Sequence, residues 1–152
     1  MISSEKLRVL LDSTYLLPII GIDIENTNEV LFSLKKLRDE EKAEYYYTQF
    51  SLLEILGKLT RIRYDRERVA AGLTSIMEEF KPIYPTVEGY LKALALRTRG
   101  YRDLIDLLLY TTSLTTNTLF LTRDYNLVEF LKRNQEDVGS ILLEKKFLEK
   151  YI

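Results

Sequence analysis

Four acidic residues occupy positions where oxygen ligands for a metal ion are expected. Each lies inside or beside a strongly apolar segment: Asp12 after LRVLL, Glu54 within TQFSLLEILGKL, Asp106 at the start of DLLLYTTSL, and Asp124 after TLFLTR. Carboxylates that meet at one point repel each other unless a divalent cation holds them. If the fold gathers these four side chains, we predict a metal site.

The composition narrows the chemistry further. The 152 residues include neither cysteine nor histidine. This excludes disulfides, thiolate nucleophiles, zinc–thiolate sites and Ser–His–Asp mechanisms. Any catalysis must therefore depend on carboxylates, hydroxyls, lysines and arginines, with or without a metal ion.

Basic residues cluster locally, although the net charge of −1 gives no overall basic field. The group from Lys58 to Arg68 is interpreted as a solvated helix face. Arg97, Arg99 and Arg102 come just before the acidic positions 103 and 106, and Arg123 precedes Asp124. We take Arg99, Arg102 and Arg123 as candidate contacts to phosphate groups.

The elements that must position these residues follow from the hydrophobic pattern. We predict strands at 7–11, 44–48, 81–85, 118–122 and 140–143, and helices at 15–20, from 27 or 28, from 48 or 51, and at 65–80, 87–97, 101–114 and 126–133. This alternation predicts an α/β fold of three layers, α/β/α, with a central, mainly parallel sheet of about 4–5 strands.

We expect one domain spanning residues 1–152, because no linker, repeat or low-complexity segment interrupts the chain. No apolar stretch reaches the roughly 20 residues that cross a bilayer, so we expect a cytoplasmic protein without membrane contacts. In such a sheet, ligands bind beyond the carboxyl ends of the strands. Asp12 and Asp124 both follow a predicted strand and fit this location.

Each acid also has a purely structural explanation. Asp12 and Asp124 could cap helices, and Asp103 and Asp106 could be favourable charges in a first helical turn. Glu54, between apolar neighbours, could belong to a surface stripe. The site prediction therefore depends on the combination of the acids.

That combination resembles the PIN-domain family of ribonucleases, in particular the VapC-type toxins of prokaryotic toxin–antitoxin pairs. VLLDST is similar to the opening strand of the family with its first Asp and a following hydroxyl residue. TQFSLLEILGKL is similar to its Ser/Thr-led helix with a Glu, DLLLYTTSL to its D-x-L-x-x-A-x-A helix, and LFLTRD to its strand ending in T-x-D. Thr111, Thr112 and Ser113 replace the usual small alanines, and residues 65–85 have little family signature.

The resemblance implies a mechanism. Asp12, Glu54 and Asp106 would bind Mg²⁺ or Mn²⁺, with Asp124 and Asp103 completing the site and Ser13 or Thr122 orienting a carboxylate or water. The ion would make a bound water more acidic for attack on an RNA phosphodiester. The implied function is a metal-dependent endoribonuclease, most simply the toxin of a VapBC-type pair.

The resemblance also implies partners: RNA, a cognate antitoxin whose tail blocks the acidic groove, and a second copy of the chain. Val30, Leu31 and Leu34 in one helix and Leu52 and Leu56 in another are candidate contacts, or simply core.

Two alternatives stay open. One is a PIN-like module for RNA binding or protein assembly with a weak or silent nuclease site. The other is an RNA-processing or DNA-directed nuclease outside a toxin–antitoxin pair. Dehalogenase-type phosphatases, receiver domains and P-loop proteins fit less well, because Thr14 stands where the first needs an Asp and the motifs of the others are absent.

Overall fold

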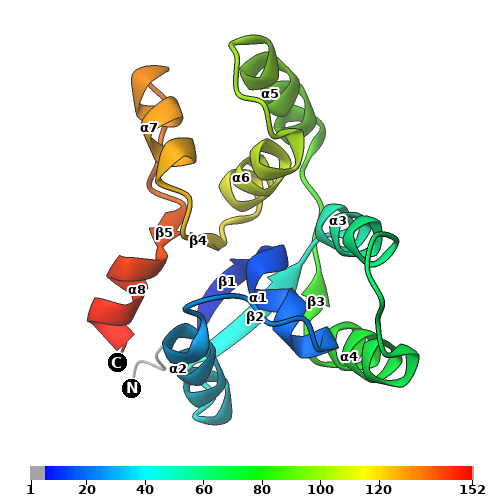
Figure 1. The fold of residues 1–152 in the computed structure, drawn as a ribbon. Coiled ribbons are helices and arrows are strands. Elements are labelled where there is room, and N and C mark those ends of the chain that lie inside the picture. Colours follow the sequence, from blue (N-terminus) through cyan, green and yellow to red (C-terminus); the bar gives the residue numbers. More distant parts are fainter. Residues whose placement is uncertain (1–5, 152) are drawn as a thin grey trace.

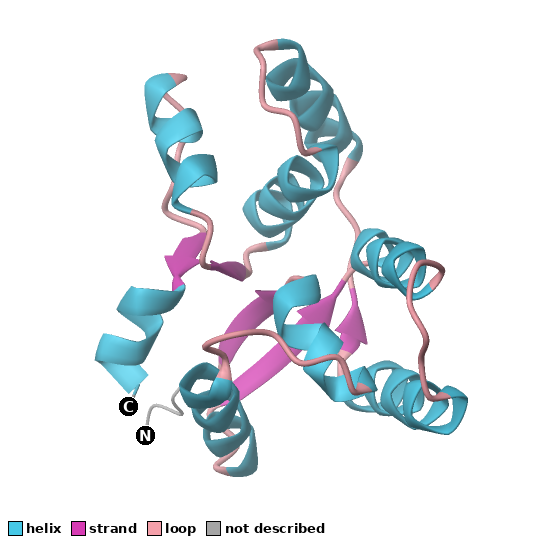
Figure 2. Cartoon of the chain, in the orientation of Figure 1, coloured by secondary structure: helices cyan, strands magenta, loops and turns pink. Residues whose placement is uncertain are grey.

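A five-stranded parallel sheet forms the centre of the protein, seen edge-on in Figure 1 and by element type in Figure 2. The computed structural model describes residues 6–151. The strands are β1 (Leu7–Leu11), β2 (Ala43–Tyr47), β3 (Lys81–Pro82), β4 (Leu119–Thr122) and β5 (Ile141–Leu143). Their order is β3-β2-β1-β4-β5, with parallel pairing throughout. The predicted parallel sheet is confirmed, and Pro82 lies on an edge strand, where its missing N–H costs little.

Helices cover both faces of this sheet. They are α1 (Ser13–Leu16), the 3₁₀ helix η1 (Leu17–Ile20), α2 (Asn28–Asp39), α3 (Gln49–Leu59), α4 (Arg66–Glu79), α5 (Val87–Thr98), α6 (Leu104–Thr116), α7 (Tyr125–Arg133) and α8 (Glu144–Tyr151). Successive strand residues point to opposite faces. Val9 and Leu11 accordingly pack with α1, α2, α4 and α8, whereas Leu10 packs with α5, α6 and α7. The predicted three-layer α/β/α fold is confirmed.

The strand order creates one point where the chain changes direction across the sheet. From β1 the chain proceeds outward to β2 and β3, and it then returns to β4 on the other side of β1. Ligand sites in open α/β sheets lie at the carboxyl ends of the strands at such a switch point. Leu11 and Leu121 pair in register there, so the segments that follow β1 and β4 emerge side by side.

Two predicted helices begin or divide differently in the structure. The helix predicted at 15–20 is split into α1 and η1, with Pro18 in the first turn of η1, and it ends at Gly21 with a positive φ of 93°. The helix predicted from Tyr101 begins only at Leu104, because the side chain of Asp103 caps it. None of the helices within residues 6–151 combines the length and apolar character needed to cross a lipid bilayer.

Candidate active site

Asp12 and Asp124 leave the sheet side by side at the switch point between β1 and β4. Both cap the helix that follows: Oδ1 of Asp12 accepts a 2.9 Å hydrogen bond from the Thr14 amide, and Oδ1 of Asp124 accepts one of the same length from the Asn126 amide. Thr122 supports this turn, since its buried Oγ1 accepts a 3.1 Å bond from the Asp124 amide. The predicted helix-capping role of both acids is confirmed, and these hydrogen bonds fix the positions of the two carboxylates.

Asp106 reaches the same edge from the first turn of α6. The Oδ1 atom of Asp103, which caps this helix, accepts a 3.1 Å hydrogen bond from the Asp106 amide. Asp103 is exposed, whereas Asp106 is half-buried. The two acids therefore have different roles: Asp103 fixes the start of the helix, and Asp106 turns its carboxyl toward Asp12 and Asp124.

Glu54 approaches from the opposite side, on α3, which follows β2. Thr48 caps this helix through a 3.2 Å bond from the Ser51 amide. One carboxylate oxygen of Glu54 accepts a short hydrogen bond from the buried hydroxyl of Ser13, the residue that follows Asp12. Ser13 thus connects Glu54 to the Asp12 turn, as expected for a residue that orients a carboxylate.

The carboxyls at the centre of this edge bind protons unusually tightly. Burial raises the pKa of Asp12 to about 7, against hydrogen bonds from Thr14 that lower it, and the Glu54 carboxylate adds to the increase. Burial also raises the pKa of Asp106 to about 8, with further increases from the negative charges of Asp103, Asp12 and Asp124. Burial and mutual repulsion therefore favour the protonated forms of Asp12 and Asp106 near neutral pH.

Within residues 6–151, no three acidic side chains stand close enough together to hold a metal ion as they are oriented here. Three of the four carboxylates are instead hydrogen-bonded to protein donors: Asp12 to Thr14, Glu54 to Ser13, and Asp124 to its helix and to Tyr101. The chemistry of the four side chains still fits a hard divalent cation, because all are carboxylates. A bound cation would also counteract the burial and the neighbouring charges that raise the pKa values of Asp12 and Asp106.

The three arginines proposed from sequence to contact phosphate lie in three different places. Arg102 is exposed and lines a cleft beside Asp106 and Asp124. Arg99 lines a separate hollow between α5 and α6. Arg123 bonds to Glu144 at 3.0 Å and to the carbonyls of Glu25 and Asn26, so its guanidinium holds the 21–27 loop against the sheet.

Sequence reasoning missed two residues at this edge, Tyr101 and Arg133. The Tyr101 hydroxyl donates a 2.8 Å hydrogen bond to Oδ2 of Asp124, and its ring packs on Phe130 at 5.0 Å. Arg133, at the end of α7, lines the same cleft as Arg102. No sequence signal identified either, because both are brought to the acids only when α6 and α7 pack on one face.

The family-model comparison agrees with this geometry. Residues 9–132 match the model of the PIN domain. The chain belongs to the PIN-domain family. The matched range contains all four acids, from Asp12 to Asp124. A comparison of the chain with curated proteins found no match.

Solved structures share the PIN fold with this chain at low sequence identity. VapBC2 from Rickettsia felis, bound to a DNA fragment from its promoter, has a TM-score of 0.64 at 15% identity and covers 91% of this chain and 98% of its own. PAE2754 from Pyrobaculum aerophilum has a TM-score of 0.60 at 13% identity, covering 95% and 89%. VapBC-1 from nontypeable Haemophilus influenzae has a TM-score of 0.58 at 16% identity, covering 86% and 96%.

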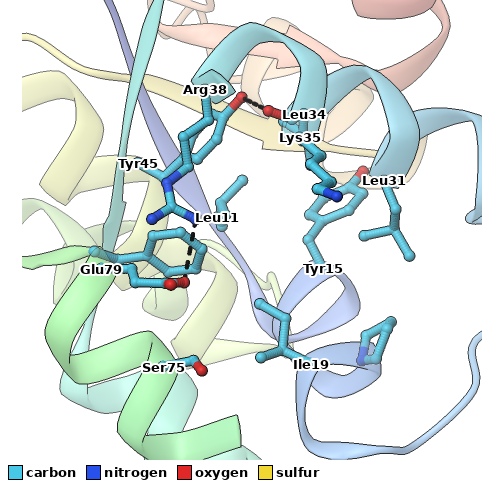
Figure 3. Close-up of a pocket in the computed structure, with 12 residues that line it drawn as sticks. Leu11, Tyr15, Ile19, Leu31, Leu34, Lys35, Arg38, Tyr45, Ser75 and Glu79 are labelled. Atoms are coloured by element: carbon cyan, nitrogen blue, oxygen red, sulfur yellow. Dashed lines mark hydrogen bonds and ion pairs between the residues drawn. The ribbon is translucent and has the colours of Figure 1, made fainter. Parts of the chain in front are cut away.

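The PIN domain carries a third hollow, an apolar groove of about 440 Å³ between α2 and α4 (Figure 3). Leu11 and Tyr45 lie beneath it, and Lys35 reaches over it from α2. Arg38 and Glu79 form a 3.1 Å ion pair from α2 to α4 at one end. Leu11 immediately precedes Asp12, so the groove and the acidic edge share one strand.

Proposed function

We propose that the protein is an endoribonuclease that depends on Mg²⁺ or Mn²⁺, with residues 1–152 acting as one nuclease domain. Asp12, Glu54, Asp106 and Asp124 would hold the ion. The observation that carries the proposal is the pair Asp12 and Asp106: two half-buried carboxyls at the switch point of the sheet, where burial raises both pKa values and the charge of Asp12 adds to the increase at Asp106. Membership of the PIN-domain family supports it.

The side chains around these acids would prepare them for binding. Asp12 and Asp106 hold protons near neutral pH and must release them to bind a cation. Ser13 and Thr122 hold the turns from which the carboxylates extend, and Tyr101 fixes one oxygen of Asp124. When bound, a divalent cation supplies charge neutralisation at the phosphoryl oxygens and activation of water for hydrolysis.

We further propose that the protein is the toxin of a toxin–antitoxin pair of the VapBC type. The support is that solved structures of this fold include VapBC complexes. The groove between α2 and α4 suits a segment of the antitoxin. Its apolar lining would take aliphatic side chains, and Lys35, which forms no ion pair with another described residue, would take a carboxylate.

The proposed second copy of the chain fits part of the surface foreseen. Val30 and Leu34 are buried core residues, which was the alternative given for them, whereas Leu56 is exposed on α3. Exposed apolar side chains lie instead on α3 and α5: Leu53, Leu56, Val87, Leu91 and Leu94. Phe50 and Tyr90 join the two helices edge to face at 6.2 Å. A patch of this kind is typical of a protein interface.

A silent PIN module is the rival function, and the observation in its favour is that no three acidic side chains of residues 6–151 stand close enough together to hold a metal ion. Cleavage of structured RNAs and single-stranded DNA, with Mn²⁺, Mg²⁺ or EDTA, separates the two. We expect metal-dependent RNA cutting that Asp106→Asn abolishes and Asp39→Asn, an exposed acid at the end of α2, leaves intact. Absence of both cleavage and metal binding would favour the silent module, and cutting of DNA alone would favour the DNA-directed nuclease.

A further inference from the structure

The cleft beside Asp106 and Asp124 has features that the metal ligands themselves do not use. It has a volume of about 420 Å³ and lies between the loop before α6 and the outer side of α7. Its lining consists of residues 100–103, Asp106, Asp124, Asn126, Glu129, Phe130 and Arg133. Because two of the proposed metal ligands belong to this lining, whatever occupies the cleft lies next to the reacting centre.

The charges of the cleft are divided between acids and arginines. Four carboxylates line it, which alone would repel a polyanion: Asp103, Asp106, Asp124 and Glu129. Arg102 comes from the loop before α6 and Arg133 from the end of α7, and both are exposed. Neither forms an ion pair with another residue of the described chain, unlike Arg123. Two guanidinium groups are therefore free to bind an anion beside an acidic centre.

The lining also has one accessible aromatic side chain. Tyr101 is half-buried, packs on the buried ring of Phe130 at 5.0 Å and is held by its hydrogen bond to Asp124. Asn126 adds an exposed amide to the lining. An aromatic ring that shares a cleft with planar cations is the surface chemistry that single-stranded nucleic acids bind, through stacking and phosphate contacts.

We propose that this cleft holds the stretch of single-stranded RNA next to the cleaved phosphodiester, with Arg102 and Arg133 each binding a phosphate. The proposal rests on the proposed nuclease function and adds the path of the strand. The guanidinium groups would offset the repulsion between the acids and the RNA backbone, since each can donate two hydrogen bonds to one phosphate. The small volume suits a short single strand, because duplex RNA is recognised across a wide minor groove.

The chain offers a matched control for each arginine. Lys132 neighbours Arg133 on α7 and is exposed but does not line the cleft. Arg97 precedes Arg102 by five residues, is exposed and does not line the cleft. Each control removes one positive charge from almost the same position in the sequence. A specific contact can therefore be separated from a general loss of charge.

Binding is measured with a labelled single-stranded RNA in EDTA, so that the strand stays uncut. We expect Arg102→Ala and Arg133→Ala each to weaken binding about tenfold and to lower the slope of log K against log salt concentration by about one unit. Arg97→Ala and Lys132→Ala should stay within about twofold of the wild type. In the metal-dependent cleavage assay, the two cleft variants should raise KM more than they lower kcat.

Several outcomes would overturn the inference. These are wild-type affinity in both cleft variants, an equal loss in the control variants, tighter binding of duplex than of single-stranded RNA, or no binding by the wild type. The proposed function is tested separately, by metal-dependent cleavage and its loss in Asp106→Asn. A nuclease whose RNA affinity and cleavage rate do not change in Arg102→Ala and Arg133→Ala would refute the proposed path of the strand but not the proposed nuclease function.

Discussion

The hydroxyl of Tyr101 donates a 2.8 Å hydrogen bond to Oδ2 of Asp124. The other oxygen of Asp124 accepts from the amides of Asn126 and Leu127 at the start of α7. The carboxylate is thus held at both oxygens, one by its own helix and one by the loop that precedes α6. Tyr101 is therefore a positioning residue for a proposed metal ligand.

Tyr101→Phe should lower the affinity for Mn²⁺ and the cleavage rate by about tenfold or more, as loss of a hydrogen bond to a metal ligand typically does. The ring would keep its packing on Phe130, so the melting temperature of the ion-free protein should change little. Calorimetric titration with Mn²⁺ measures the affinity. Tyr125→Phe, an exposed tyrosine one residue after Asp124, is the control. Unchanged Mn²⁺ affinity in Tyr101→Phe would show that Asp124 needs no such support.

Asp12→Asn should stabilise the ion-free protein at pH 8. Folding raises the pKa of Asp12 from 3.8 to about 7. The contribution of protonated Asp12 to the free energy of unfolding is therefore fully present below about pH 4, and it is lost as the pH rises through 7 and the buried carboxyl ionises. One pKa unit corresponds to about 1.4 kcal/mol. Because the side chain is only half-buried, we expect a gain of about 2 kcal/mol at pH 8.

The free energy of unfolding, from urea titrations at pH 4.5 and pH 8, tests this expectation. The difference between Asp12→Asn and the wild type should be small at the lower pH, since Asn accepts the Thr14 amide bond as the protonated acid does. Asp39→Asn, at the exposed end of α2, should show no such pH dependence. If Asp12→Asn and the wild type are equally stable at pH 8, the ionised carboxylate of Asp12 does not destabilise the fold.

The sequence predicts those parts of the site that are encoded by short, continuous segments. The turns that hold Asp12, Glu54 and Asp124 are encoded within a few residues, by an apolar strand followed by a capping side chain, and all three were correctly placed after strands or in helices. The start of α6 was predicted three residues too early. The helical spacing of apolar residues continues back to Tyr101, but Asp103 caps the helix, so Tyr101 lies in the loop before it.

The arginines show what local patterns could not reveal. Arg99, Arg102 and Arg123 were equivalent in the sequence, as basic residues near acids. Their different surroundings come from tertiary packing: Arg123 contacts Glu144, which follows β5, and Arg99 lines the hollow between α5 and α6. Arg133 was overlooked because only the packing of α7 beside α6 brings it to the cleft.

Divalent cations should stabilise the folded protein, and more so at higher pH. Binding must displace protons from Asp12 and Asp106, whose pKa values are about 7 and 8, so affinity should fall as the pH drops from 8 to 6. A ligand at a hundred times its Kd adds about 2.7 kcal/mol, which corresponds to a rise in Tm of about 5 °C or more. Thermal melts with Mn²⁺ or Mg²⁺ at both pH values measure this. An equal shift in Asp106→Asn would place the bound ion elsewhere.

Lys35→Glu should weaken the complex with the proposed antitoxin. Lys35 reaches over the apolar groove, whereas its neighbour Lys36 does not line it (Figure 3). We expect a loss of affinity of about tenfold or more for Lys35→Glu, because the new carboxylate would repel that of the partner. Lys36→Glu should bind as the wild type does. The test needs a candidate antitoxin, such as the product of a small reading frame next to this gene, and measures its binding by titration calorimetry. Equal effects of both variants would mean that the partner docks outside the groove.

Leu94→Glu should convert a dimer to a monomer. Leu94 is 57% exposed on α5, one turn after Tyr90, whose ring packs on Phe50 of α3, and a charge there would be buried without a partner in a symmetric interface. Sedimentation equilibrium of the wild type should give twice the mass of one chain, and the variant the mass of one. Phe32→Glu serves as the control, because Phe32 is 71% exposed on α2, away from this patch. A dimer that survives Leu94→Glu but dissociates in Phe32→Glu would move the interface to α2, and a monomeric wild type would remove the second copy from the proposal.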